Sequence, residues 1–210
     1  MTGTGTEVGK SVVAAAISRT LAAEGKRVHV FKPAVTGIDE GGEADHELLR
    51  RAAGSSQSDE EIAPYRYGPP MSPHLAAGMD GEEIEPARLL NAARAAADGA
   101  DALVCEGVGG LLVPLAPNYL VRDLAVDLGL PLVVAAPPGL GTINHTLLTL
   151  EAVRSAELHV RAVVLTPWPE APSAIEKSNR DTIGTLGEVE IVVLPPLDLD
   201  DPSTWPAVEH

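Results

Sequence analysis

A chain of 210 residues with 45% hydrophobic and 21% charged residues is a folded protein rather than a disordered one, and we expect residues 1–210 to form a single domain. The net charge of −15 excludes nucleic acid as a natural partner, because a phosphate backbone would repel the chain. Cys105 is the only cysteine, which rules out an internal disulfide and suits the cytoplasm, and the longest apolar run, residues 130–140, is too short to span a membrane.

Strands and helices are expected to alternate along the chain. The first helix is predicted at residues 11–25, because Val13, Ile17 and Leu21 recur at four-residue spacing and Gly25 ends the pattern. Further helices are predicted at residues 45–54, 86–98, 119–129, 142–157 and from about 173 to 187, strands at residues 27–33, within 100–110, at 130–136, 160–166 and 189–195, and a long polar excursion at 55–85.

Several of these strands are almost continuously apolar, which is typical of strands buried on both faces of a sheet. Such strands alternating with helices predict an α/β fold, with a mainly parallel, doubly wound sheet and helices on both faces. Ligands bind at the carboxyl ends of the strands in sheets of this kind. The polar and glycine-rich segments of the chain fall at that edge.

The opening stretch, MTGTGTEVGKS, raises the question of a phosphate-binding loop. The usual pattern, G-x-x-x-x-G-K-[ST], would place its first glycine at position 4, where the chain has Thr4. Gly3 lies one residue too early and Gly5 one residue too late. The stretch is therefore either a variant phosphate loop or a chance Gly/Thr-rich start.

The end of this stretch supplies the groups that phosphate binding requires. Gly9 lets backbone N–H groups approach phosphate oxygens, Lys10 provides a cation and Ser11 a hydroxyl for Mg²⁺. A predicted helix follows directly, and the positive end of its dipole favours anions. We favour a phosphate loop and a fold of the P-loop NTPase type.

Glu106 follows the apolar run ALVC and is surrounded by Gly107, Gly109 and Gly110. A carboxylate at the carboxyl end of a strand is a usual position for a residue that holds Mg²⁺ or orients water in nucleotide hydrolases. The alternative is a solvated acid at a turn. The glycines favour a functional group, because they let backbone or ligand come close.

Three other segments contain candidate functional residues. Lys32, at the end of the second predicted strand, is either a surface lysine or a second cation beside the phosphate loop. Asp45 opens a predicted helix, and taken alone it is best explained as an N-cap. GLGTINHT, residues 139–146, places small and polar residues at a helix start, which suits an anion or a carboxylate.

Five segments occur in a characteristic order: TGTGTEVGKS, KPAVTG, EADHELL, PPMSPHLAA, and CEGVGGLLVPL followed by GLGTINHTLLT. Together they resemble the dethiobiotin synthetases, the ATP-dependent carboxylases of biotin biosynthesis, over most of the chain to about residue 150. The phosphate loop of that family has one extra residue between its glycines, as between Gly3 and Gly9 here. The unusual spacing of the opening stretch is therefore a family feature.

The resemblance implies a cyclo-ligase that forms C–N bonds. Enzymes of this family take 7,8-diaminononanoate, CO₂ and a nucleoside triphosphate, with Mg²⁺. One amine captures CO₂ as a carbamate, the carbamate oxygen attacks the γ-phosphate to give a carbamic-phosphoric anhydride, and the second amine closes the ring. The family is a homodimer whose substrate site lies near the interface, with neither nucleic acid nor membrane as a partner.

The resemblance also implies a role for individual residues. The expected catalytic residues are Lys10, Lys32 and Thr6; the nucleotide-binding residues are Thr4, Gly5, Glu7, Val8, Gly9, Lys10 and Ser11; the substrate-binding residues are Thr36, Gly109, Gly141, Thr142 and Asn144; and the ligands of Mg²⁺ are Ser11, Asp45 and Glu106.

The chain departs from the family pattern in three places. The family usually has a strand of about five residues before the phosphate loop; a start codon set too late would explain its absence here, and otherwise we expect the sheet to lose its central strand. Gly5 replaces an acidic residue that is frequent in the family. Residues 166–172, TPWPEAP, stand where the family often has Asn-Asp, whose Asn reads adenine, so ATP or another nucleoside triphosphate is expected.

Two other classes share this phosphate loop. Amidotransferase-linked ligases of cobalamin synthesis are longer and carry a glutaminase domain with a catalytic cysteine, for which the chain has no room. Switch ATPases that act in partition or septum positioning carry a signature lysine five residues before the position of Lys10, where the chain has Gly5. The dethiobiotin synthetase interpretation is preferred over both.

Overall fold

The structure is a computed structural model that describes residues 1–208. Its strands are β1 (Thr2–Gly3), β2 (Val28–Phe31), β3 (Ala102–Cys105), β4 (Pro114–Ala116), β5 (Tyr119–Leu120), β6 (Leu132–Ala136), β7 (Val160–Leu165) and β8 (Ile191–Val193). Its α-helices are α1 (Lys10–Ala23), α2 (Asp45–Ala53), α3 (Asp59–Ile62), α4 (Pro73–Met79), α5 (Pro86–Ala97), α6 (Val121–Leu128), α7 (Thr142–Ser155) and α8 (Ala174–Gly187), with 3₁₀ turns at Ile38–Glu40 and Pro202–Thr204.

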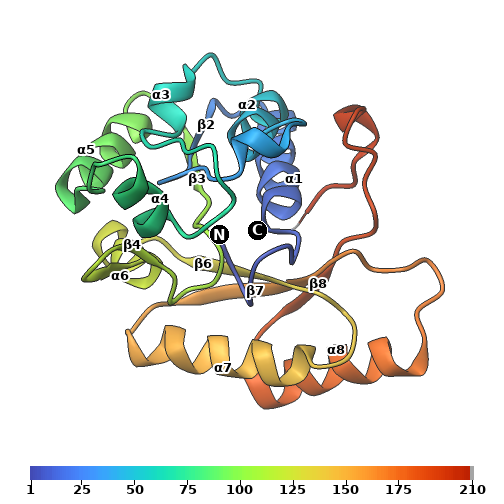
Figure 1. Ribbon diagram of the computed structural model, residues 1–210. Coiled ribbons are helices and arrows are strands. Elements are labelled where there is room, and N and C mark those ends of the chain that lie inside the picture. The colour runs from blue at the N-terminus through green and yellow to red at the C-terminus, as the bar shows by residue number, and fades with distance from the viewer. Residues whose placement is uncertain (209–210) are drawn as a thin grey trace.

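The main strands are parallel and form two sheets that meet at the N-terminus. One sheet has the order β1-β6-β7-β8, and the other pairs β2 with β3. Met1 joins them, because its nitrogen donates to the carbonyl of Cys105 and its carbonyl accepts from Gly107. Helices α7 and α8 cover one face, while α1 and the remaining helices lie on the other (Figure 1). The predicted parallel, doubly wound α/β fold is confirmed.

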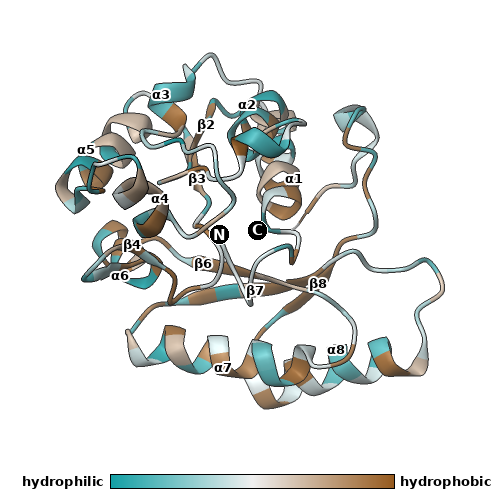
Figure 2. Cartoon of the chain, viewed as in Figure 1, coloured by the Kyte–Doolittle hydropathy of each residue, from teal (hydrophilic) through white to brown (hydrophobic). Residues whose placement is uncertain are grey.

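The interior strands are buried on both faces, as their apolar sequences predict. Val134 and Val163 pack in the cluster with α7 and α8, whereas Ala135 and Val164 pack in the cluster around α1. Side chains of successive strand residues point to opposite faces of the sheet, so each strand packs against the helices on both faces. Hydrophobic residues accordingly run along β6, β7 and β8, while α2 and α3 are more hydrophilic (Figure 2).

Some predicted elements differ from the observed ones. Tyr119 and Leu120, expected to begin a helix, instead form β5, which pairs antiparallel with β4 before α6 begins at Val121. The excursion at residues 55–85 contains the short helices α3 and α4, whose four and seven residues are too few for a periodic pattern to reveal. No helix within residues 1–208 is both long and apolar enough to cross a membrane.

The strand that leads into the phosphate loop, β1, has two residues. Thr2 and Gly3 pair with Val134 and Ala135 of β6, and among residues 1–208 no further strand lies between β3 and β6. The sheet is therefore continuous only at its carboxyl edge, which is the edge where ligands bind in this class of fold.

Candidate active site

The chain turns sharply between β1 and α1, and its glycines make this turn possible. Gly9 adopts a left-handed conformation with φ of 86°, and a Cβ added there would lie 2.5 Å from Cγ2 of Thr166. A Cβ on Gly3 would lie 2.6 Å from Cγ2 of Val8. Only glycine fits these two positions without displacing a neighbour. The turn leads directly into the N-terminal end of α1, which begins at Lys10, as phosphate-binding loops do.

Lys10 folds back over this turn. Its Nζ donates to the carbonyl of Gly5 at 2.9 Å, and the side chain is largely buried. Burial lowers the pKa of Lys10 below its ordinary value, although Glu106 acts in the opposite direction. The ammonium is therefore poorly solvated and held above the loop, where an anion would be attracted to it.

Four side chains from distant parts of the chain meet beside Lys10. Lys32 Nζ lies 2.8 Å from Glu106 Oε1 and 2.8 Å from Asp45 Oδ2. Ser11 Oγ lies 2.7 Å from Asp45 Oδ1 and 2.8 Å from Glu106 Oε1. Parallel strands β2 and β3 end side by side, so Lys32 and Glu106 emerge together, and Ser11 and Asp45 reach them from the first turns of α1 and α2.

The charges in this cluster stabilise one another. Burial would lower the pKa of Lys32, but the adjacent Glu106 and Asp45 outweigh burial and raise the pKa above its ordinary value. Burial would likewise raise the pKa of Asp45, but Lys32 outweighs it and the pKa is lowered. Both groups are therefore ionised at neutral pH, and the cluster carries a fixed cation between two acids.

The cluster has the donor set that Mg²⁺ prefers. Glu106 has 0% of its surface exposed, and its Oε2 has no hydrogen-bond partner. Ser11 approaches two carboxylates with only one hydroxyl proton, so one of these contacts lacks a hydrogen at any time. A divalent cation among these oxygens would satisfy both. The described residues contain no group of three or more His, Cys, Asp or Glu side chains suited to a metal, so phosphate and water would have to complete the coordination.

The structure decides the interpretations that the sequence left open. The N-cap of α2 is Ala44, whose N–H is bound by Glu47, so the interpretation of Asp45 as an N-cap was wrong. Glu106 is fully buried rather than a solvated acid at a turn. Lys32 is 2% exposed and is not a surface lysine. All three belong to one cluster.

The remaining phosphate-loop residues lie around the turn. Thr6 and Glu7 are exposed at its tip, and Glu7 has a positive φ of 57°. Thr4 donates its N–H to the carbonyl of Ala135, which fixes the start of the turn to β6. Gly109 lies beside the tip, because a Cβ added there would be 3.6 Å from Oγ1 of Thr6. The glycine-rich segment after β3 thus borders the phosphate loop.

A polar cavity of about 480 Å³ adjoins the cluster. Thr36, Asp45 and His46 are among its lining residues, together with the glycine-rich segment 41–42 and Arg66. Asp45 therefore faces both the lysine cluster and this cavity. A small polar molecule in the cavity would reach the cluster at Asp45.

The predicted residues at the start of α7 lie on the opposite face of the sheet from α1 (Figure 1). Gly141 is the N-cap of α7 with φ of 87°, and Asn144 is exposed in its first turn. Thr142 is buried, and its hydroxyl lies 3.4 Å from that of Thr146. Within residues 1–208, no hydrogen bond or ion pair joins these residues to the lysine cluster.

Asn179 is a residue that sequence reasoning missed. It is buried on α8, and its Nδ2 donates to the carbonyls of Pro138 at 2.8 Å and Gly139 at 3.0 Å. These bonds fix the loop that leads into α7. An asparagine inside a predicted helix gives no local signal of such a role, because its partners lie about 40 residues earlier in the chain.

The fold and the phosphate loop define the class of protein to which the chain belongs. Residues 1–203 match the family model described as AAA domain. Two solved structures are similar in fold: the cell division ATPase MinD of Pyrococcus furiosus (TM-score 0.54, 15% identity, 97% of this chain and 82% of that one) and a ParA family ATPase of Chlorobium tepidum (0.56, 14%, 94% and 83%). At such low identity these structures show the fold alone. The chain is a P-loop NTPase.

Curated relatives narrow the class further. The chain is 41% identical over 200 residues to the ATP-dependent dethiobiotin synthetase of Anaeromyxobacter dehalogenans strain 2CP-C, covering 95% of this chain and 90% of the relative. It is 32% identical over 197 residues to the enzyme of the same name from Bacillus subtilis strain 168, covering 93% and 85%. The chain belongs to the ATP-dependent dethiobiotin synthetase family. The resemblance identified from five sequence segments is confirmed.

Proposed function

We propose that the protein converts 7,8-diaminononanoate, CO₂ and ATP, or another nucleoside triphosphate, to dethiobiotin in biotin biosynthesis, and that residues 1–210 act as one synthetase domain. The observation that carries this proposal is the buried cluster of Lys32 with Asp45 and Glu106, placed beside a phosphate loop and open through Asp45 to a polar cavity. A ligase that transfers a phosphoryl group to a small polar acceptor needs these three features together.

Each step of the proposed reaction builds or moves negative charge. One amine of the substrate forms a bond to the carbon of CO₂ and loses a proton, which gives a carbamate. An oxygen of the carbamate then attacks the γ-phosphorus, and the bond from this phosphorus to the bridging oxygen of the nucleoside diphosphate breaks. Finally, the second amine attacks the carbonyl carbon and loses a proton, and the bond from this carbon to the phosphate oxygen breaks, so that inorganic phosphate leaves as the ring closes.

The proposed roles of the chain's residues follow from their charge. Lys10, poised over the loop, would bind the β- and γ-phosphates as backbone N–H groups of the loop after Thr4 cradle them. Lys32 would stabilise the carbamate and the phosphoryl group in transfer, because it stays protonated between its two acids. Thr6 would lie against the carbamate, and Thr36 and Gly109 would contact the diamine.

The proposed cation is Mg²⁺, held by Ser11, Asp45 and Glu106. The unpartnered Oε2 of Glu106 and the hydroxyl shared between two carboxylates support this ligand set. When bound, Mg²⁺ neutralises charge on the β- and γ-phosphates. Within the chain, Lys32 orients both carboxylates for that role.

We further propose a cytoplasmic homodimer. Leu140 is 86% exposed in the loop before α7, and Leu148 on α7 is also exposed, so an apolar surface adjoins the proposed carboxylate site at Gly141, Thr142 and Asn144. A partner subunit that covered this surface would bring its own helix start to a substrate site near the interface. Cys105 is a free thiol, which agrees with a reducing compartment.

The direct test is incubation of the purified protein with 7,8-diaminononanoate, bicarbonate, Mg²⁺ and a panel of nucleoside triphosphates. The panel matters because residues 166–172 lack the Asn-Asp pair. We expect dethiobiotin and stoichiometric inorganic phosphate with at least one triphosphate. Lys10→Ala and Lys32→Ala should each abolish turnover. Absence of dethiobiotin with every triphosphate would refute the proposed reaction.

A further inference from the structure

Residues 57–62 lie along the outer edge of β2, the edge that β3 does not occupy. In a parallel ladder, alternate residues of a strand bond to the same side. The carbonyl of Phe31 accepts from the N–H of Glu106 on the inner edge, so Val30 and Lys32 turn their backbone groups outward. We call residues 57–62 the β2 clamp. No step of the proposed reaction involves these residues.

Gln57 takes the place of a partner strand at Val30. Its side chain is buried, its Oε1 accepts from the N–H of Val30 at 2.8 Å, and its Nε2 donates to the carbonyl of Val30 at 3.1 Å. One side-chain amide thus satisfies both backbone groups of a buried strand residue, as the backbone of a neighbouring strand would. The hydroxyl of Ser55 donates to the same Oε1 at 2.9 Å, which holds the amide in this orientation.

Ile62 forms the other end of the β2 clamp. The N–H of Lys32 donates to the carbonyl of Ile62 at 2.8 Å, and the side chain of Ile62 is fully buried. Within the clamp lies α3, where Ser58 and Glu61 form a capping box. The clamp is therefore a compact turn whose two ends bond to β2 two residues apart.

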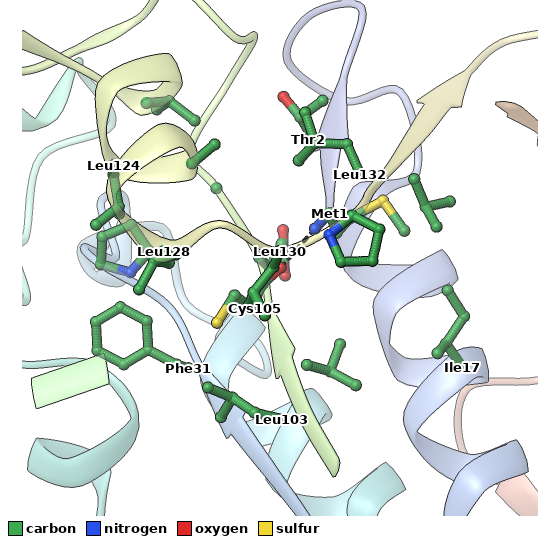
Figure 3. A pocket seen from close by; sticks show the side chains of 18 of the residues that line it. Met1, Thr2, Ile17, Phe31, Leu103, Cys105, Leu124, Leu128, Leu130 and Leu132 are labelled. Atoms are coloured by element: carbon green, nitrogen blue, oxygen red, sulfur yellow. Dashed lines mark hydrogen bonds between the residues drawn. The ribbon is translucent and has the colours of Figure 1, made fainter. Parts of the chain in front are cut away.

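The backbone of Lys32 is restricted on every side. Pro33 limits Lys32 to extended conformations, in addition to the bond from the clamp. Side chains alternate between the two faces along β2. Phe31 lines an apolar cavity of about 240 Å³ together with side chains of β3 and β6 (Figure 3). Lys32 lies on the other face, where it meets Asp45.

The β2 clamp also contacts α2, the helix that begins at Asp45. Asp59, in the first turn of α3, pairs with Arg50 of α2, and its Oδ1 lies 3.7 Å from Nε2 of His46. His46 is buried and follows Asp45 directly in the chain. One short segment thus binds both the strand that leads to Lys32 and the helix that carries its acidic partner.

We propose that the β2 clamp positions Lys32 against Asp45 for phosphoryl transfer, and that Gln57 is its principal positioning residue. The side chain of Gln57 bonds to Val30 rather than to the lysine cluster, so it acts through β2. Displacing this amide would leave a buried N–H and a buried carbonyl unsatisfied, which holds the strand edge in place. The catalytic part of the proposal rests on the proposed ligase reaction, whereas the placement of Lys32 does not.

The first test replaces Gln57 with methionine, which keeps the length and unbranched shape of the side chain but removes both bonds to Val30. NMR at one fixed pH then measures two properties of Lys32. One is hydrogen exchange of its amide, which donates to Ile62 and not to Gln57. The other is the signal of its ammonium protons, which the buried ion pair protects from solvent. In Gln57→Met we expect amide exchange at least about tenfold faster and loss of the ammonium signal.

The second test measures turnover in the synthetase assay. Gln57→Met should lower kcat by about tenfold and leave the KM for the nucleoside triphosphate unchanged, because Lys10 and the phosphate loop are untouched. Ser58→Ala, a milder variant that opens the capping box of α3, should lower kcat by about twofold and speed exchange at Lys32 in the same direction. Leu21→Ala is the stability control, because it removes a buried side chain at the far end of α1 from Lys10. It should lower the melting temperature but change neither kcat nor the signal of Lys32.

An unchanged ammonium signal of Lys32 in both clamp variants would overturn the proposal and leave Gln57 a purely structural residue. An equal fall of kcat in Leu21→Ala would do the same, because it would ascribe the effect to lost stability. A lost signal with full kcat would overturn the catalytic role of the clamp. If the parent forms no dethiobiotin, the ligase reaction fails, but the two NMR measurements still decide whether the clamp places Lys32.

Discussion

Lys32 Nζ and Glu106 Oε1 lie 2.8 Å apart, and both side chains are withdrawn from solvent. The two residues are 74 positions apart in the chain and meet because β2 and β3 are adjacent parallel strands that end together. Asp45 gives Lys32 a second acid at the same distance. Because this ion pair is buried and lies in the candidate active site, a substitution at either residue should change both the stability of the fold and the activity.

Lys32→Met should destabilise the protein strongly, because it leaves the buried carboxyl group of Glu106 without its cationic partner. We expect the free energy of unfolding in urea to fall by about 3–5 kcal/mol, with loss of turnover. Adding Glu106→Gln to this variant should recover part of the stability but none of the activity. Lys26→Met removes an exposed pair with Glu24 and should change stability by less than about 1 kcal/mol. Equal losses at the two lysines would contradict the buried-pair interpretation.

The cluster should also shape the dependence of stability on pH. The pKa of Lys32 is raised, so its contribution is present below the ordinary value of 10.5 and is lost as pH rises through the folded-state pKa. The pKa of Asp45 is lowered, so its contribution is present above 3.8 and is lost as pH falls through the folded-state pKa. Stability should therefore decline at both extremes.

Asp45→Asn isolates the acid part of this dependence. Urea midpoints measured from about pH 5 down to pH 2 should fall less steeply in the variant than in the parent. Because Asp45 is half-exposed and solvent screens its pairing, we expect a difference below about 1 kcal/mol. Asp181→Asn, which alters an exposed pair with Arg180, should leave the acid profile of the parent intact. An unchanged profile in Asp45→Asn would argue that its carboxylate is not held by Lys32.

Gly9→Ala tests the phosphate loop. Alanine at φ of 86° costs about 1 kcal/mol in backbone strain, and its Cβ would also strike Thr166. Gly25→Ala is the matched control, because Gly25 has φ of 83° with nothing within 4 Å of the added Cβ. We expect Gly9→Ala to lose more stability than the control, and only Gly9→Ala to weaken ADP binding by calorimetry. Unimpaired ADP binding by Gly9→Ala would count against the loop as the phosphate site.

Asn179 is expected to position the start of α7. Asn179→Asp removes the donor to Pro138 and Gly139, so the loop before α7 should loosen. If this helix start binds the substrate carboxylate, the KM for the diamine should rise by about tenfold while kcat changes little. Ser178→Ala, at an exposed neighbour on α8, should alter neither parameter. A fall in kcat with KM unchanged would show that Asn179 does not act through carboxylate binding.

The exposed leucine before α7 tests the proposed homodimer. Leu140→Asp should shift the protein toward monomer in sedimentation equilibrium, because a charge would enter an apolar interface. Leu186→Asp alters another exposed leucine, on α8, and should leave association unchanged. Equal association of Leu140→Asp and the parent would place any interface elsewhere.

Much of the fold could be predicted because its helices and strands follow from local sequence patterns. The four-residue spacing of Val13, Ile17 and Leu21 indicates the buried face of a helix. Continuous apolar runs indicate strands that are covered on both faces of the sheet. The phosphate loop was recognised from Gly9, Lys10 and Ser11, since each supplies a group that phosphate or Mg²⁺ requires. The short helices α3 and α4 escaped prediction because so few residues complete too few turns for a pattern.

The sequence by itself determined the class of fold, the phosphate loop and the family, since each rests on neighbouring residues or on motifs in order. Only the tertiary structure decided that Asp45 pairs with Lys32 rather than capping α2, and that Asn179 holds the loop before α7. It alone revealed the apolar cavity lined by β3 and β6. These features depend on which strands lie side by side, and strand order is set by long-range packing that no local periodicity records.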